Sequence, residues 1–194
     1  MKIKKLHFMD RFMLHLKNEN YIPKDASELL HQSRDLSSGM NVTIRDTRVS
    51  RKFLEFDVSI EKENLDELLT KMKPLGELDH AKHVVEEEIP KENAIKDGIS
   101  YFNAERFWEC HEVFEGVWKK CYGEEKILVQ GIILVAAALV HFQKNENEIC
   151  ISILNRALAK LTNTPGQYSN IDVDSLRNKV NEIITSGKIS TFLI

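Results

Sequence analysis

Residues 107–121 read FWECHEVFEGVWKKC, and residues 127–142 read ILVQGIILVAAALVHF. Apolar residues recur at helical spacing in the first stretch, and the second is apolar almost all round, which is typical of a central helix covered on every side. The second stretch is too short, and too polar at Gln130, for a bilayer span of about 20 apolar residues. We therefore expect a soluble helical domain around these two helices, with no membrane partner.

The helical pattern continues through the rest of the C-terminal half. No strand pattern is found beyond Lys91, and the helices are interrupted by Gly123, by the Asn145–Asn147 turn and by Pro165-Gly166. The pattern predicts an all-α domain over residues 91–194, with about five helices arranged as helical hairpins. The expected helices cover roughly residues 91–103, 105–121, 124–144, 147–162 and 172–186.

Residues 1–88 alternate between strand and helix patterns in the order βαββαβ. Leu54, Phe56 and Val58 alternate with polar residues such as Glu55 and Asp57, which indicates a half-buried strand. The order βαββαβ is that of a ferredoxin-like domain, in which one face of an antiparallel sheet carries both helices. Strands are expected at 12–17, 41–50, 51–61 and 78–86, and helices follow a capping box at Asp25 and Glu28 and a cap at Asn64.

The boundary between the two patterns is polar. Glu86, Glu87, Glu88 and Pro90 separate the mixed pattern from the purely helical one. A change of period at a charged hinge indicates two domains. We expect an α+β protein with a ferredoxin-like domain over 1–88 and an all-α domain over 91–194.

Composition restricts the partners and the compartment. Lys and Arg total 27 against 30 Asp and Glu, a net charge of −3, which gives no global attraction to nucleic acid or anionic membranes. The three cysteines, Cys110, Cys121 and Cys150, form no CxxC pair and are odd in number, which favours reduced thiols over a disulfide framework or a zinc site. Asp10 and Arg11 interrupt any apolar core of a signal peptide. We expect a cytoplasmic protein.

Two polar residues stand out in the helical half. On a helical projection His111 and Glu115 fall within the aromatic stripe, which would aim them at the core. Gln130, in the following helix, could meet them across the helix interface. His141 shares the line of Gln130 but lies about 16 Å further along, so we interpret it as a hydrogen-bonded core histidine.

The pair has two interpretations. Glu115 could bond to His111 merely to fix helix packing, or it could orient the ring so that the other nitrogen serves as a base, a proton relay or a ligand. In the second case His111, Glu115 and Gln130 are the catalytic candidates. His111-Glu112-x-x-Glu115 lacks the second histidine of HExxH, so no metal site is predicted, and no motif identifies a cofactor.

These residues resemble a known family. YFNAERFWECHEVFEGVWKKC, LVQGIILVAAALVHFQKN and ILNRALAKL are together similar to the family of domains of unknown function numbered 309, over about residues 93–162. The resemblance implies a small α-helical domain with a tetratricopeptide-like helix pair, and it implies no activity. Cys110 replaces the usual small alanine, and the ferredoxin-like prediction rests on pattern alone. The family positions fall on Phe102, Phe107, Trp108, Glu109, His111, Glu112, Glu115, Trp118, Gln130 and Gly131.

Three functions are compatible with the sequence. The leading hypothesis is a noncatalytic binding or scaffold module for a peptide or small ligand, in a chain that can form a homodimer through its sheet. The alternative is a hydrolase or proton-transfer enzyme with His111 as base. A third hypothesis, RNA or phosphate binding, takes Arg45, Arg48, Arg51 and Lys52 as a basic patch, but a solvated hairpin is favoured because no RNP1-like run is present.

Overall fold

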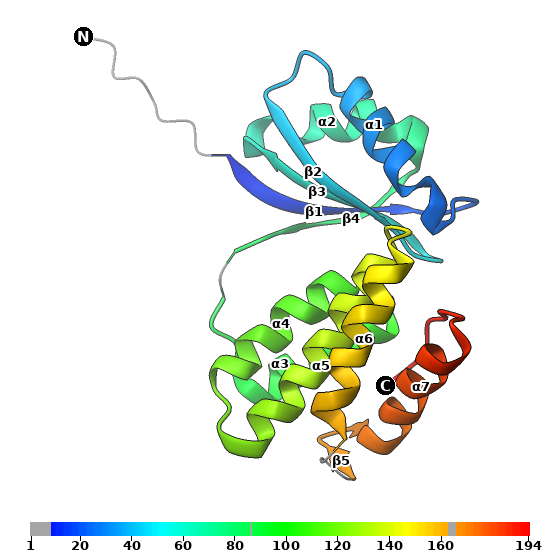
Figure 1. The fold of residues 1–194 in the computed structure, drawn as a ribbon. Helices are drawn as coiled ribbons and strands as arrows, with labels where there is room; N and C mark the ends of the chain where they lie inside the picture. Colours follow the sequence, from blue (N-terminus) through cyan, green and yellow to red (C-terminus); the bar gives the residue numbers. More distant parts are fainter. Residues whose placement is uncertain (1–8, 86, 163–165) are drawn as a thin grey trace. The chain divides into compact units, whose positions relative to one another are not determined.

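The computed structural model describes residues 9–85, 87–162 and 166–194 (Figure 1). The chain forms two compact units, Met1–Glu87 and Glu88–Ile194, called here the N-terminal unit and the helical unit. A four-stranded antiparallel sheet is followed by five helices, α3 to α7, so the predicted α+β class is confirmed. Two sequence features, Glu86 of the polar hinge and Pro165 of the last break, lie outside the described residues.

The N-terminal unit has the βαββαβ order expected of a ferredoxin-like fold. Its strands lie in the order β2-β3-β1-β4, and every neighbouring pair is antiparallel. This order places the first and third strands at the centre of the sheet. The elements are β1 (Asp10–Lys17), α1 (Ala26–Leu36), β2 (Val42–Val49), β3 (Phe53–Ile60), α2 (Leu65–Met72) and β4 (Leu78–His83).

One face of this sheet packs on the two helices. Alternate residues of β3, including Leu54, Phe56 and Val58, form an apolar core with Leu29 of α1 and Leu68 of α2. The alternation that predicted the strand therefore also selects the face that the helices cover.

The other face of β3 differs from the prediction of a half-buried strand. Glu55 and Asp57 are also buried, although they are charged. Arginines of neighbouring strands lie over them: Arg11 of β1 pairs with Asp57 at 2.6 Å, and Arg48 of β2 pairs with Glu55 at 2.8 Å. The alternation of polar and apolar residues shows that β3 has a polar face. It does not show whether that face contacts solvent or is covered by ion pairs.

The start of α1 also differs from its prediction. The Asp25 carboxylate accepts a hydrogen bond from the Ile22 N–H at 2.8 Å, in a short 3₁₀ turn, Pro23–Asp25, that precedes the helix. Asp25 makes no side-chain cap on α1 itself, so the expected capping box with Glu28 is wrong. Asn64 likewise precedes α2 without a side-chain cap, after the turn Lys62–Asn64. Asp25 and Asn64 are residue types that commonly begin helices. Here each lies in a 3₁₀ turn that precedes the α-helix.

In the helical unit consecutive helices pack side by side, with α5 between α4 and α6 (Figure 1). A pair of two-residue strands, β5 (Gln167–Tyr168) and β6 (Ile171–Asp172), precedes the last helix, so the expectation of no strand in this half was wrong. Two residues are too few to give a period. The helices are α3 (Lys91–Asn103), α4 (Phe107–Lys119), α5 (Gly123–Phe142), α6 (Asn147–Leu161) and α7 (Val173–Ser186).

The apolar helix α5 is the core of the bundle. It is long and apolar enough to cross a membrane by composition, but Val129, Ile132 and Leu139 are buried against the other helices. At Gly131 an added Cβ would lie 2.8 Å from Cδ2 of Leu161, so the glycine permits close packing of α5 on α6. This is the packing of the central helix of the bundle.

Candidate functional site

Four apolar residues of helix α4 form a buried stripe. Phe107, Cys110, Phe114 and Val117 are fully buried and follow the spacing i, i+3, i+7, i+10. The stripe faces α3 and α5, which both pack on α4. Residues beside the stripe are consequently held at defined positions on a rigid helix.

His111 and Glu115 do not point into the core, contrary to the prediction. The His111 side chain is 25% exposed and that of Glu115 is 48% exposed. Cys110 and Val117 move the centre of the buried stripe about 80° away from His111 and about 120° away from Glu115 on a helical projection. A projection centred on the aromatic residues alone missed this shift.

His111 lies between two carboxylates of the same helix. Its Nδ1 is 3.3 Å from Oε1 of Glu112, and its Nε2 is 3.6 Å from Oε1 of Glu115. One ligand atom from each of these residues lies within 4.8 Å of the others. We call His111, Glu112 and Glu115 the α4 cluster. It combines one imidazole nitrogen with two exposed carboxylates, a donor set that suits divalent transition metal ions.

Gln130 is not part of this cluster. It lies half-buried on α5, and none of the hydrogen bonds among the described residues joins it to His111 or Glu115. The third residue of the cluster is Glu112 instead. Its position next to His111 in the sequence could have suggested this. His141 is half-buried, and its Nδ1 pairs with Glu146, which agrees with a structural histidine.

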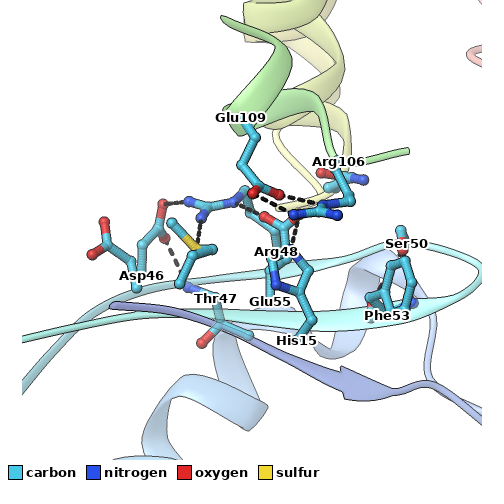
Figure 2. Close-up of polar contacts among 12 residues, drawn as sticks. His15, Asp46, Thr47, Arg48, Ser50, Phe53, Glu55, Arg106 and Glu109 are labelled. Atoms are coloured by element: carbon cyan, nitrogen blue, oxygen red, sulfur yellow. Dashed lines mark hydrogen bonds and ion pairs between the residues drawn. The ribbon is translucent and has the colours of Figure 1, made fainter. Parts of the chain in front are cut away.

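Glu109 has a different role from the other carboxylates of α4. Arg106 donates two hydrogen bonds to it, from Nε and from Nη2, across the first turn of the helix (Figure 2). The guanidinium of Arg106 also lies 4.6 Å from the ring centre of Tyr101. Such a bidentate pair fixes the beginning of α4 and so helps to position His111.

The turn between α3 and α4 holds a second arrangement that the sequence did not reveal. Asn103 and Glu105 bind the backbone and side chains of residues 188–194, which follow α7. Hydrogen bonds between residues 91 positions apart have no local sequence signal.

The four basic residues considered as a phosphate patch differ in exposure: Arg48 is buried, whereas Arg45, Arg51 and Lys52 are exposed. Arg48 donates to Glu55 and Asp46, and its Nη2 lies 2.9 Å from the sulfur of Met13 (Figure 2). Arg45 donates to the Ser59 hydroxyl at 2.6 Å. Arg48 therefore lies on the sheet rather than in solvent, which corrects the solvated-hairpin interpretation for this residue alone, and two carboxylates balance its charge.

These ion pairs belong to a polar row that crosses all four strands. Arg48, Glu55, His15 and His80 are register partners on β2, β3, β1 and β4. The rings of His15 and His80 stack at 4.1 Å. Burial raises the pKa of Glu55, but the charges of Arg48 and His15 outweigh it, and the pKa lies below its ordinary value. The row holds the sheet together by cross-strand pairs.

The cysteine thiols are unsuited to catalysis. All three are free and buried. Burial raises the pKa of Cys150 to about 12 and raises that of Cys110 further. Since the thiolate is the reactive form, these cysteines act as small apolar residues of the core.

Known proteins match part of the chain. Residues 95–153 match the family model described as "Domain of unknown function (DUF309)". An "Uncharacterized protein" of Aquifex aeolicus is 28% identical over 96 residues, which are 49% of this chain and only 29% of that protein's length. A crystal structure of a "conserved hypothetical protein" from Thermus thermophilus is 32% identical over 47% of this chain and 95% of that one, with a TM-score of 0.42.

The family match lies within the stretch whose motifs suggested it, and it includes the α4 cluster. Over residues 95–153 of its helical unit, the chain is similar to the DUF309 family of domains of unknown function.

Proposed function

We propose that the helical unit is a noncatalytic binding module whose α4 cluster binds a divalent transition metal ion such as Zn²⁺. The observation that supports the proposal is the position of His111 between two carboxylates: its Nε2 lies 3.6 Å from Oε1 of Glu115, and its Nδ1 lies 3.3 Å from Oε1 of Glu112. Adjacent ligands of a tetrahedral zinc ion lie about 3.4 Å apart, so small rotations suffice. The exposure of Glu115 permits the rotation that brings its carboxylate and Nε2 of His111 to this spacing.

The two ring nitrogens of His111 would have different roles. Nε2 and the Glu115 carboxylate, one helical turn apart, are placed to chelate the ion together. Glu112 faces Nδ1, where a carboxylate orients the ring and makes the other nitrogen a better donor. Water would complete the coordination, because the helix supplies only these groups at this position.

The buried stripe of α4 makes the cluster more than a chance group of surface side chains. Phe114 and Val117 fix the rotation of the helix about its axis, and the Arg106–Glu109 pair fixes its first turn. The backbone under His111 is therefore preorganised, which lowers the entropy that binding must overcome.

A second candidate function uses the same pair. The Glu115 contact with Nε2 and the partial exposure of His111 also suit a base in hydrolysis or proton transfer. In that case His111→Ala would abolish a reaction that proceeds in the presence of a chelator, whereas a metal-binding module gives metal-dependent binding and no turnover.

The proposal includes a cytoplasmic location. Three free, buried cysteines are typical of a reducing compartment, where no disulfide is required for stability. Binding of nucleic acid is not part of the proposal, since Arg48 is already balanced by Glu55 and Asp46.

Native mass spectrometry with added Zn²⁺ tests the proposal. We expect one ion per wild-type chain and a loss of at least ten-fold in affinity for His111→Ala. His31→Ala is the matched control, because His31 is an exposed histidine on α1. Equal binding by wild type and His111→Ala would overturn the proposal.

A further inference from the structure

The turn between α3 and α4 is rigid and unusual. Its Glu105 has a φ of 61°, in the left-handed region that residues with a Cβ rarely adopt. The surrounding structure maintains this conformation: the Glu105 side chain and backbone are buried, and its carbonyl accepts a hydrogen bond from Nε2 of Gln143 at 2.6 Å. The turn is therefore a preformed surface, held by the end of α5.

This surface holds the end of residues 188–194 by its backbone. Oδ1 of Asn103 accepts a hydrogen bond from the Ile194 N–H at 2.9 Å, and Nδ2 of Asn103 donates to the Ile194 carbonyl at 3.2 Å. A side-chain amide that pairs with both backbone groups of one residue imitates a neighbouring β-strand, so it recognises an extended conformation rather than a particular side chain.

Other contacts involve the side chains of the same segment. The Thr191 hydroxyl donates to Oε1 of Glu105 at 2.9 Å, and the Phe192 ring lies 5.5 Å from the ring of Phe102. Leu193 points away and is 71% exposed. The contacts thus define a pattern of a hydroxyl residue, an aromatic residue, any residue and an aliphatic residue.

The segment is less buried than the helix before it, although Ile189, Phe192 and Ile194 pack partly buried against the core. Gly187, with a φ of 68°, ends α7, and residues 188–194 form neither helix nor strand. None of these seven residues is fully buried, whereas α7 buries Val180 and Ile183 among others. Segments with few buried side chains open at low free-energy cost, independently of the rest of a domain.

We propose that the turn between α3 and α4 is a recognition site for an extended segment of another protein, and that residues 188–194 occupy it as a displaceable strap. The partner segment carries the hydroxyl, aromatic and aliphatic residues in the same spacing. Because the strap is tethered next to the site, it acts at a high effective concentration and excludes weak competitors. Only a partner with further contacts displaces it. This site is separate from the α4 cluster and needs no metal ion.

The test uses the heptapeptide of residues 188–194 as the probe and isothermal titration calorimetry as the readout. A variant that ends after Gly187 should bind the peptide, and the full-length chain should bind it at least ten-fold more weakly. Replacement of Thr191 by Val in the peptide should weaken binding several-fold through loss of the Glu105 contact. Asn103→Ala in the shortened chain should weaken binding by about ten-fold, because two backbone hydrogen bonds are lost.

Three outcomes would overturn the proposal. One is no binding by the shortened chain while its circular dichroism remains helical. The second is equal affinity of the full-length and shortened chains, which would show that the segment does not compete. The third is dimerisation of the full-length chain by exchange of residues 188–194, which would make a second copy the partner.

A full-length variant keeps the test independent of whether the shortened chain folds. Phe192→Ala removes the ring that contacts Phe102 but leaves the site itself intact. We expect this variant to bind the heptapeptide more tightly than the wild type does, and to exchange the amide hydrogens of residues 188–194 faster. If Phe192→Ala changed neither the affinity for the heptapeptide nor the exchange rate of these amide hydrogens, the proposed role of residues 188–194 as a strap would be contradicted.

Discussion

Nε2 of His111 lies 3.6 Å from Oε1 of Glu115, one turn further along α4. Both side chains are partly exposed, and a surface pair of this kind contributes little to stability. The pair is therefore available for a ligand without cost to the fold. Variants of the α4 cluster should change metal affinity far more than they change the free energy of unfolding.

The two carboxylates of the cluster should differ in their effects. Glu115→Gln removes a direct ligand and should abolish most Zn²⁺ binding. Glu112→Gln removes the group that orients the ring, and we expect about a ten-fold loss. Titration calorimetry measures both, and Glu148→Gln, an exposed residue of α6, is the control. A larger loss for Glu112→Gln than for Glu115→Gln would contradict the assigned roles.

Close packing of α3 on α4 depends on Gly98. An added Cβ would lie 2.4 Å from Cε2 of Phe114, so Gly98→Ala should destabilise the helical unit by about 1–3 kcal/mol. Gly116→Ala is the matched control: no atom lies within 4 Å of its added Cβ, and the exposed helical position should gain up to about 1 kcal/mol. Urea denaturation measures both. Equal changes would show that the Gly98 contact is unimportant.

The polar row of the sheet should make the N-terminal unit sensitive to Glu55. Glu55→Gln leaves Arg48 without its 2.8 Å partner, and the loss of a buried charge from a pair costs about 3 kcal/mol. Thermal unfolding measures the loss, and Glu63→Gln, at an exposed position, should have almost no effect. A Glu55→Gln variant as stable as Glu63→Gln would contradict a stabilising role for the row.

The same carboxylate predicts the direction of a pH effect. The pKa of Glu55 is lowered from its ordinary value of 4.5, so its contribution to stability is present above about pH 4.5. The contribution disappears as the pH falls through the lower pKa of the folded state. The stability difference between wild type and Glu55→Gln should therefore shrink on acidification below pH 4.5. A difference that grows over that range would contradict the lowered pKa.

In the helical unit, Glu125 should likewise contribute to stability at neutral pH and lose that contribution in acid, but the effect should be smaller. The hydrogen bond from Lys91, at 2.6 Å, lowers the pKa of Glu125, and the Tyr168 hydroxyl adds a second hydrogen bond. The pair is about one-third exposed, so Glu125→Gln should cost about 1 kcal/mol or less at neutral pH. The cost should vanish in acid. Urea denaturation at two pH values measures it, and a larger cost in acid would contradict the pairing.

The helix boundaries were predictable because the apolar period is strong. The stripe through Phe107 and Phe114 and the continuous apolar run of α5 predicted those two helices to within two residues at each end. Two-residue strands such as β5 carry no period, and the 3₁₀ turn at Asp25 uses the same residue types as a helix cap. A local sequence pattern therefore does not distinguish a two-residue strand from a loop, or a 3₁₀ turn from the first turn of a helix.

The candidate site was predictable only in part. His111 and Glu115 were identified because polar residues interrupt an aromatic pattern, but their direction depends on Cys110 and Val117, which extend the buried stripe away from them. Gln130 could not be placed, because the contact of two helices depends on their packing rather than on either sequence. The hydrogen bond between Asn103 and Ile194 joins residues that are 91 positions apart, so no local sequence pattern predicts it.

The most direct test of the metal-binding proposal follows the histidine ring resonances by two-dimensional NMR during addition of Zn²⁺. The chain has seven histidines, and the resonances of His111 can be assigned from their loss in His111→Ala. We predict that the His111 ring shifts first and saturates at one ion per chain, and that Glu115→Gln removes the shift. If other histidines respond first, or if His111 does not shift, the α4 cluster is not a metal site.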